Sequence, residues 1–192
     1  RIYHIASGQH FVGRFPPRAV GEGAHYRGNP LDFSVNYRAL LVRLAEWAAD
    51  GKEPPTSRYP RHADNTIASL SEVNFPKMSS VDFPGVIHTA YHADYGPRWP
   101  RGIVDIQPPK LGKTYASMVS QVDRFGNEVA GVRNVEIVVP LATHTPWNLR
   151  IGAPGGEDEL SDFIGTMIPL STTEAQKSKM QDPRPSIEKL YA

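Results

Sequence analysis

The chain opens with Arg1-Ile2-Tyr3-His4-Ile5-Ala6-Ser7-Gly8-Gln9-His10, and its architecture is best worked out from this stretch. Residues 1–5 predict a buried strand, because most of them are apolar or aromatic and small residues follow at once. Residues 6–9 predict a turn, and His10 lies just beyond it. A histidine raised off a strand end by such a turn is where many serine hydrolases keep their general base. His10 is therefore the first candidate for a catalytic residue.

The chain lacks the serine motif that such a histidine would serve. No Gly-x-Ser-x-Gly motif, which places a nucleophile on a tight strand-to-helix turn, occurs in its 192 residues. If His10 is catalytic, we expect the nucleophile on polypeptide outside these residues. The chain also begins inside an expected strand and without a methionine. We therefore expect residues before Arg1, and a lost leader for the periplasm or for secretion stays an open alternative.

Residues 30–50 predict a long amphipathic helix, with Asn29 as its N-cap and Pro30 at its first position. Gly51 is expected to end it in the left-handed conformation. One face repeats apolar side chains at helical spacing: Tyr37, Leu40, Leu41, Leu44, Trp47 and Ala48. We expect this face to be part of the core rather than a cofactor site. One edge strand and one helix would by themselves leave an apolar face uncovered.

Composition excludes several classes of function. The 21 Lys and Arg balance 20 Asp and Glu, so the one-sided basic surface of nucleic-acid binders is missing. The chain has no cysteine, which excludes disulfides, thiolate metal sites and cysteine nucleophiles, and which fits export and cytoplasm equally well. No apolar run approaches the roughly 20 residues of a membrane span. The 18 prolines and 16 glycines indicate long ordered loops over a modest core.

Residues 54–192 predict a loop-rich, Pro-rich extension with short elements. Short strands are expected over residues 66–70, 86–91 and 115–123, the last of which turns at 123–128 and returns over 129–133. The capping-box spacing at Ser171-Thr172-Thr173-Glu174 predicts a helix to about Met180, and Ser186 is expected to cap a last helix.

Several stretches, kept in order, carry a resemblance to a known family. They are Ser7 to His10, Asn29 to Leu41, Trp47 with Gly51 to Pro60, Val122 to Arg133, Pro140 to Arg150, and Asp182-Pro183-Arg184. Together they resemble the C-terminal portion of the alpha/beta hydrolase domain family, larger and mostly bacterial proteins regarded as esterases of largely unassigned substrate.

The resemblance implies a C-terminal part of an α/β-hydrolase-like fold. Residues 1–53 would end the hydrolase core with its last strand, the His10 loop and the packing helix, and residues 54–192 would cover it. The resemblance places the serine and the acid of the catalytic triad upstream, and a further helix after Asp182-Pro183-Arg184. It implies no cofactor, and its implied partners are the N-terminal remainder of the same domain and a small-molecule ester.

Residues 143–150 form the densest polar and aromatic cluster, Thr143-His144-Thr145-Pro146-Trp147-Asn148-Leu149-Arg150. As a substrate-facing loop, it would offer Trp147 as a hydrophobic wall and His144 and Arg150 as polar contacts. As a structural loop, it would be anchored by Trp147, with Asn148 and Arg150 bonded to backbone carbonyls. We favour the structural interpretation and keep His144, Trp147 and Arg150 as substrate-binding candidates.

Two other motifs have ordinary explanations. His88 and His92 have the spacing of a helical metal pair, but Pro84-Gly85 and Gly96-Pro97 leave little room for a helix, so we interpret them as surface or lining residues. Residues 123–128 fail the calcium-loop spacing, and the glycines form no nucleotide-binding pattern.

The sequence thus favours the C-terminal segment of a serine-type ester hydrolase that supplies His10 as the general base. Two alternatives remain. The first is a non-catalytic hydrolase-like module that binds a ligand or partner or plays a structural part. The second is a processed subunit that stays with its N-terminal half after cleavage.

Overall fold

The computed structural model describes residues 1–17, 19, 24–151 and 159–192 of the chain. Residues 11–28 are rich in Pro, Gly and Arg, which predicts a long loop, and part of this stretch lies outside the described residues. The helices are α1 (Ser34–Asp50), α2 (Val135–Val138), α3 (Glu174–Met180) and α4 (Ile187–Tyr191), with 3-10 turns at His62–Asp64, Leu70–Glu72 and Trp99–Arg101. The strands are β1 (Ile67–Ala68), β2 (Tyr91–Asp94), β3 (Lys110–Thr114), β4 (Val119–Ser120), β5 (Ala142–Thr145) and β6 (Thr166–Pro169).

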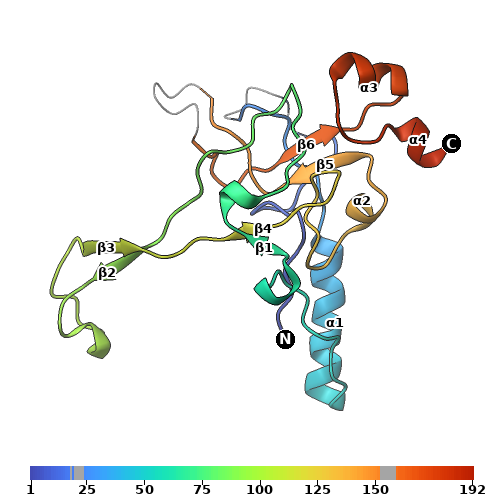
Figure 1. Cartoon of the computed structure of the whole chain (residues 1–192). Coiled ribbons are helices and arrows are strands. Elements are labelled where there is room, and N and C mark those ends of the chain that lie inside the picture. The colour runs from blue at the N-terminus through green and yellow to red at the C-terminus, as the bar shows by residue number, and fades with distance from the viewer. Residues whose placement is uncertain (18, 20–23, 152–158) are drawn as a thin grey trace.

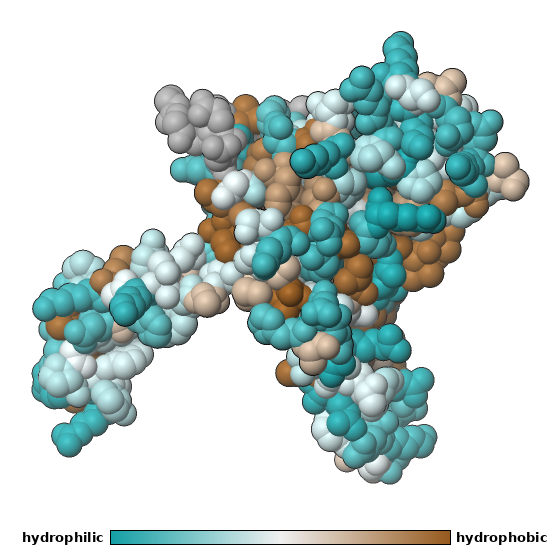
Figure 2. Space-filling model, in the orientation of Figure 1, coloured by the Kyte–Doolittle hydropathy of each residue, from teal (hydrophilic) through white to brown (hydrophobic). Residues whose placement is uncertain are grey.

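The described strands form three antiparallel pairs: β1 with β4, β2 with β3, and β5 with β6. The β5–β6 pair runs from Ala142 opposite Pro169 to Thr145 opposite Thr166, and it lies in the central body of the molecule (Figure 1). The β2–β3 hairpin and α1 project from this body as two separate arms (Figures 1 and 2). Every residue of β2 and β3 is exposed, so the hairpin stands free of the rest of the described chain.

The strand expected over residues 1–5 is not a regular strand of a sheet, and this expectation is corrected. The segment is extended but makes two isolated parallel bridges, from Tyr3 to Arg58 and from Ile5 to Val132. The backbone of His4 donates to Arg58 and accepts from Val132, at 2.8 and 2.7 Å. A parallel strand needs a long neighbour beside it, and Pro54, Pro55 and Pro60 restrict the pairing near Arg58.

The long helix exists, but it begins at Ser34 rather than at Pro30. Asn29 is not its cap, because the amide of Asn29 is buried and bonded to distant segments of the chain. The Asp32 carboxylate accepts instead from the Ser34 backbone N–H at 2.9 Å, one turn later than expected. Gly51 ends the helix in the left-handed conformation, as the sequence predicts.

The apolar face of α1 has no covering layer within the described chain. None of the helix residues is buried, and Leu41 remains 65% exposed. The burial falls just before the helix, where Leu31 and Phe33 are almost fully enclosed. The base of α1 is therefore fixed to the body, while most of its length projects away from it (Figure 1).

A buried ion pair closes the central body on the C-terminal side. The Arg184 guanidinium pairs with Asp182 at 2.7 Å and donates to Thr143 and to the carbonyls of Ile168 and Pro169. Burial opposes ionisation of Asp182, but hydrogen bonds from Arg184 and its charge outweigh that effect and hold the pKa of the carboxyl below its usual range. Arg184 thereby ties the C-terminal segment to both strands of the β5–β6 pair.

The shorter elements follow the sequence unevenly. The second expected strand begins at Tyr91 rather than at Val86, and of residues 115–123 only Val119 and Ser120 form a strand. The turn at 123–128 is confirmed, since the Asp123 backbone N–H donates to Asn127 at 2.8 Å. Helix α3 starts after Thr173, and Ser186 caps α4 as expected. Within the described ranges, no helix has the length and apolar character to cross a membrane.

Candidate active site

His10 lies on a surface groove of about 520 Å³. Its ring meets the edge of Phe11 with 4.7 Å between ring centres, and it packs at a tilt on Phe163 at 4.4 Å. Trp147 and Leu160 continue the same groove. Within the described chain, neither ring nitrogen of His10 has a hydrogen-bond partner. The imidazole is therefore exposed, and two aromatic rings fix its position.

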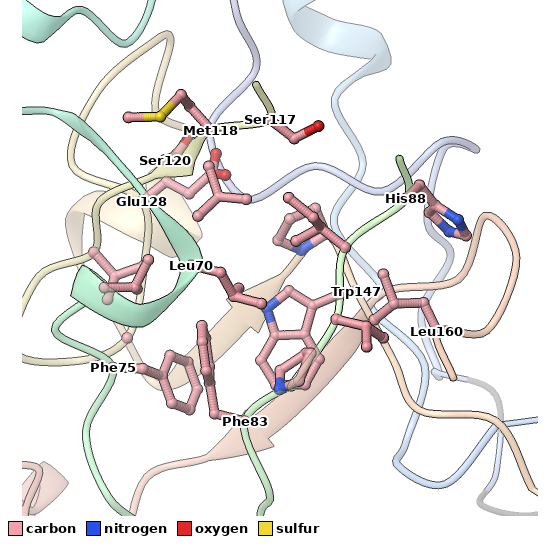
Figure 3. Close-up of a pocket in the computed structure, with 18 of the residues that line it drawn as sticks. Leu70, Phe75, Phe83, His88, Ser117, Met118, Ser120, Glu128, Trp147 and Leu160 are labelled. Atoms are coloured by element: carbon pink, nitrogen blue, oxygen red, sulfur yellow. The ribbon is translucent and has the colours of Figure 1, made fainter. Parts of the chain in front are cut away.

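A cavity of about 360 Å³ adjoins this groove. Phe75, Phe83 and Trp147 form an aromatic wall, with ring centres 5.1 to 5.7 Å apart and two of the three contacts edge to face. Figure 3 shows Phe75 and Phe83 on the side of the cavity opposite Ser117, Met118 and Ser120. Aliphatic side chains complete the lining: Leu70, Val73, Val86, Ile87, Met118, Val119, Val122 and Leu160. This volume lies within the roughly 300–1,000 Å³ of small-molecule sites.

Trp147 connects the two hollows. It lines both the groove beside His10 and the cavity, as do His88, Pro146 and Leu160. Its backbone carbonyl accepts hydrogen bonds from the hydroxyl groups of Thr145 and Thr166, at 2.6 and 2.7 Å. The structure thus combines the two interpretations of this loop, because Trp147 is anchored by the fold and also forms part of a ligand-sized wall.

Glu128 supplies the carboxylate of the cavity. It is only 6% exposed, and its Oε2 atom accepts from the Ser7 backbone N–H and bonds His4 Nε2, both at 2.7 Å. In return, the backbone N–H of Glu128 donates to Ser7 Oγ at 3.0 Å. The hydrogen bond to Glu128 raises the pKa of His4 despite partial burial of the ring. Glu128 therefore fixes the turn that precedes His10.

Ser7, His4 and Glu128 contain the three residue types of a hydrolytic triad, but they are not connected as one. In a triad the imidazole lies between the hydroxyl and the carboxylate. Here the carboxylate lies between His4 and the backbone of Ser7. Ser7 is also fully buried, with a φ of 57°. We interpret this cluster as the support of the turn rather than as a nucleophilic centre.

His144 is a buried, neutral acceptor at the cavity. It is 5% exposed, and burial lowers its pKa to about 4. Its Nδ1 atom lies 3.0 Å from Asn29 Oδ1, which also accepts from the Leu31 backbone N–H, while the Asn29 amide nitrogen donates to Ser7 and Thr145. Asn29 Oδ1 can only accept, so His144 carries its proton on Nδ1 and leaves Nε2 as an acceptor.

The family model described as alpha/beta hydrolase domain matches residues 1–192. The chain belongs to the alpha/beta hydrolase domain family. The comparisons with curated proteins and with solved structures return no match.

For this alpha/beta hydrolase domain chain, membership of the family indicates a hydrolase-like function on a small-molecule substrate. It confirms the family resemblance drawn from the sequence. The mixture of helices and small sheets fits part of an α/β fold.

Of the remaining candidates in the hydrolase domain, Arg150 and His92 do not line the cavity. Arg150 is exposed, and its guanidinium pairs with Glu159 at 3.0 Å. His88 lines the groove and the cavity, whereas His92 stacks on Tyr115 in the projecting hairpin with 3.8 Å between ring centres. Among the residues that the structure describes, no group of three or more His, Cys, Asp or Glu side chains is arranged to hold a metal.

Two polar groups of the site were not identified from the sequence. Glu128 stands in the hairpin turn, 121 positions from the serine that it holds, and Asn29 was assigned to a helix cap. A buried Asn that serves distant carbonyls has no local signature. For Glu128 the only available signal was an acidic residue at the end of a predicted turn, directly before the apolar Val129 and Ala130.

Proposed function

We propose that this chain is the C-terminal segment of a serine-type carboxylic ester hydrolase and that His10 is its general base. The exposed, unbonded imidazole of His10 at a groove that adjoins an apolar cavity supports this assignment. The serine nucleophile and the carboxylate that orients the ring are assigned to polypeptide outside these residues, the N-terminal remainder of the same domain.

The reaction divides between that serine and His10. His10 accepts the hydroxyl proton as the serine oxygen attacks the ester carbonyl, and it returns the proton to the alkoxide when the carbon–oxygen bond breaks. A water then attacks the acyl-serine ester while His10 takes its proton. His10 passes this proton to the serine oxygen as the acyl carbon–oxygen bond breaks, which releases the acid and restores the serine. His10 suits this cycle because imidazole exchanges protons near neutral pH.

The substrate contacts in this proposal come from the residues that line the groove and the cavity. Trp147 forms a hydrophobic wall shared by the groove and the cavity, and His144, which lines the cavity, is assigned as a hydrogen-bond acceptor through Nε2. Arg150 is assigned only an outer role, because its guanidinium is engaged with Glu159 at the surface. We expect the scissile carbonyl at His10 and one apolar group of the ester beyond Trp147.

The test is hydrolysis of 4-nitrophenyl butyrate by the intact protein. General-base catalysis contributes about 10²–10⁴ to the rate, so His10→Ala is expected to lower kcat by at least about 10²-fold with little change in KM. His62→Ala, in an exposed 3-10 turn, is the matched control and should keep the normal kcat. Near-normal turnover by a folded His10→Ala protein would overturn the assignment.

A non-catalytic binding module remains the alternative, and one observation favours it. The cavity is built wholly from residues of this chain, whereas the nucleophile is not. The two proposals differ in one outcome. Saturable binding of an apolar ligand by an intact protein that hydrolyses no ester at any substrate concentration would support the binding module.

A further inference from the structure

The carboxylate of Glu128 uses only one of its two oxygens. Both hydrogen bonds from the turn end on Oε2, and within the described chain Oε1 has no partner. Glu128 is nevertheless almost entirely buried and lines the cavity. An acceptor oxygen that has no hydrogen-bond partner in the protein, on a residue that lines an apolar cavity, can accept a hydrogen bond from a ligand there.

The charge around Glu128 determines what kind of partner fits. His4 bonds the same carboxylate, and its raised pKa favours the protonated ring, which offsets the negative charge. An anion would still be repelled by the free lone pairs of Oε1. An ammonium group would lose its hydration in an apolar cavity and would gain little from a carboxylate whose charge His4 already offsets. A neutral O–H donor avoids both costs.

The rest of the cavity lining determines what kind of ligand skeleton can carry this O–H donor. Phe75, Phe83 and Trp147 offer ring faces and edges at one end, and the remaining walls are mostly aliphatic, with a few polar side chains that include His88, Ser117, Ser120 and His144. Flat rings gain from offset or edge-to-face contact with such a wall. Figure 3 shows Glu128 on the side of the cavity opposite Phe83, so a ring on the aromatic wall can direct a substituent toward the carboxylate.

We propose that the cavity binds a hydroxylated ring, a neutral phenol or a similar ring alcohol, with the ring on the Phe75–Phe83–Trp147 wall and the hydroxyl donating to Glu128 Oε1. Glu128 is thereby assigned as a specificity-determining residue. The identification of this ring as the apolar group of the ester rests on the proposed hydrolase function. Binding of the ring itself does not.

The test uses binding, not turnover, so it stands apart from the esterase assay. The intact protein is titrated calorimetrically with 4-methylphenol and with 4-methylanisole, which replaces the donating hydroxyl by a methyl ether. Hydrogen bonds to charged groups are about twice as strong as neutral ones, so we expect the phenol to bind about tenfold more tightly or better. Equal affinities, or no binding of the phenol up to its solubility, would overturn the proposal.

Glu128→Gln supplies the decisive comparison. Gln still offers an oxygen to the Ser7 N–H but turns an N–H₂ group toward the cavity, and this group donates to the ether as readily as to the hydroxyl. The preference for phenol over ether is therefore expected to fall to within about threefold. A mere loss of stability would weaken both ligands alike and leave the ratio unchanged, which would contradict us.

A control variant and a second pair of ligands complete the experiment. Glu136→Gln, an exposed change in α2 outside the cavity, should keep the tenfold preference of the unmodified protein. Benzylamine and benzyl alcohol then compare a cationic donor with a neutral one on the same ring. Tighter binding of the amine would overturn the choice of a neutral hydroxyl and assign the cavity to ammonium compounds instead.

Discussion

Acid should destabilise this protein through His144, and the size of the effect follows from the structure. The folded protein holds His144 neutral, with a pKa lowered from 6.5 to about 4 by burial. Between these values the unfolded chain binds a proton that the folded protein refuses, so stability falls as the pH falls. Each pKa unit is worth roughly 1.4 kcal/mol, so a pKa lowered from 6.5 to about 4 removes about 3 kcal/mol from the free energy of unfolding once the pH is below both values.

The perturbation that isolates this effect is His144→Gln. Gln can donate to Asn29 Oδ1, as the Nδ1–H of His144 does, but it does not titrate. Urea unfolding followed by circular dichroism at pH 7 and pH 4.5 gives the free energy of unfolding of both proteins. The unmodified protein should lose about 2–3 kcal/mol more than the variant on acidification.

The control for this experiment is His62→Gln, an exposed change that should leave the pH dependence as it is. An identical pH dependence of the unmodified protein and His144→Gln would refute the reasoning. So would an imidazole resonance of His144 that titrates near its ordinary value of 6.5, since burial could then not be excluding the proton.

Two further predictions concern the ion pairs of the structure. The pKa of His4 is raised by Glu128, so its stabilising contribution is present below about pH 6.5 and is lost as the pH rises through the raised value. His4→Gln should therefore cost more stability at pH 6 than at pH 9 in urea unfolding, and equal costs would contradict this. Arg184→Met should cost about 3–5 kcal/mol, because it leaves Asp182 as an uncompensated buried charge. Arg98→Met breaks the exposed pair with Asp105 and should cost far less, because water screens that pair, and similar losses in the two variants would show that Arg184 does not act through its burial.

Local signals predicted the parts of the fold that local interactions determine. Gly51 and Ser186 occupy helix ends where a left-handed conformation or a side-chain oxygen satisfies the neighbouring backbone, regardless of the rest of the chain. Helix α3 was also predicted, but Thr173 caps it rather than Ser171, the residue that the capping-box spacing indicated. The turn at 123–128 formed for the same reason, since Asp123 bonds residues within its own turn.

Tertiary contacts decided the parts that the sequence misplaced. Asn29 has the composition of a cap, yet its amide serves Ser7, Thr145 and His144, which no spacing along the chain could reveal. Residues 1–5 have the composition of a strand, but they form only two isolated parallel bridges, each to a single residue. The burial that makes His144 neutral and the bonds that hold Glu128 are likewise properties of contacts between remote segments.

The turn before His10 was predicted from its small residues, and the Gly8 backbone N–H closes it by donating to the Ile5 carbonyl. His10 and Trp147 line the same groove, which the sequence did not predict. The cavity itself was not predicted, because its walls come from segments separated by long loops that meet only in the fold. The catalytic role of His10 remains a prediction.

The most direct test of that role is covalent labelling of the intact protein with a fluorophosphonate, which reacts with serines that a base has activated. The label, mapped by peptide mass spectrometry, is expected on a serine outside residues 1–192, and His10→Ala should slow its attachment by at least about 10²-fold. Attachment to Ser7 or to another serine of this chain, or an unchanged rate in His10→Ala, would contradict the account.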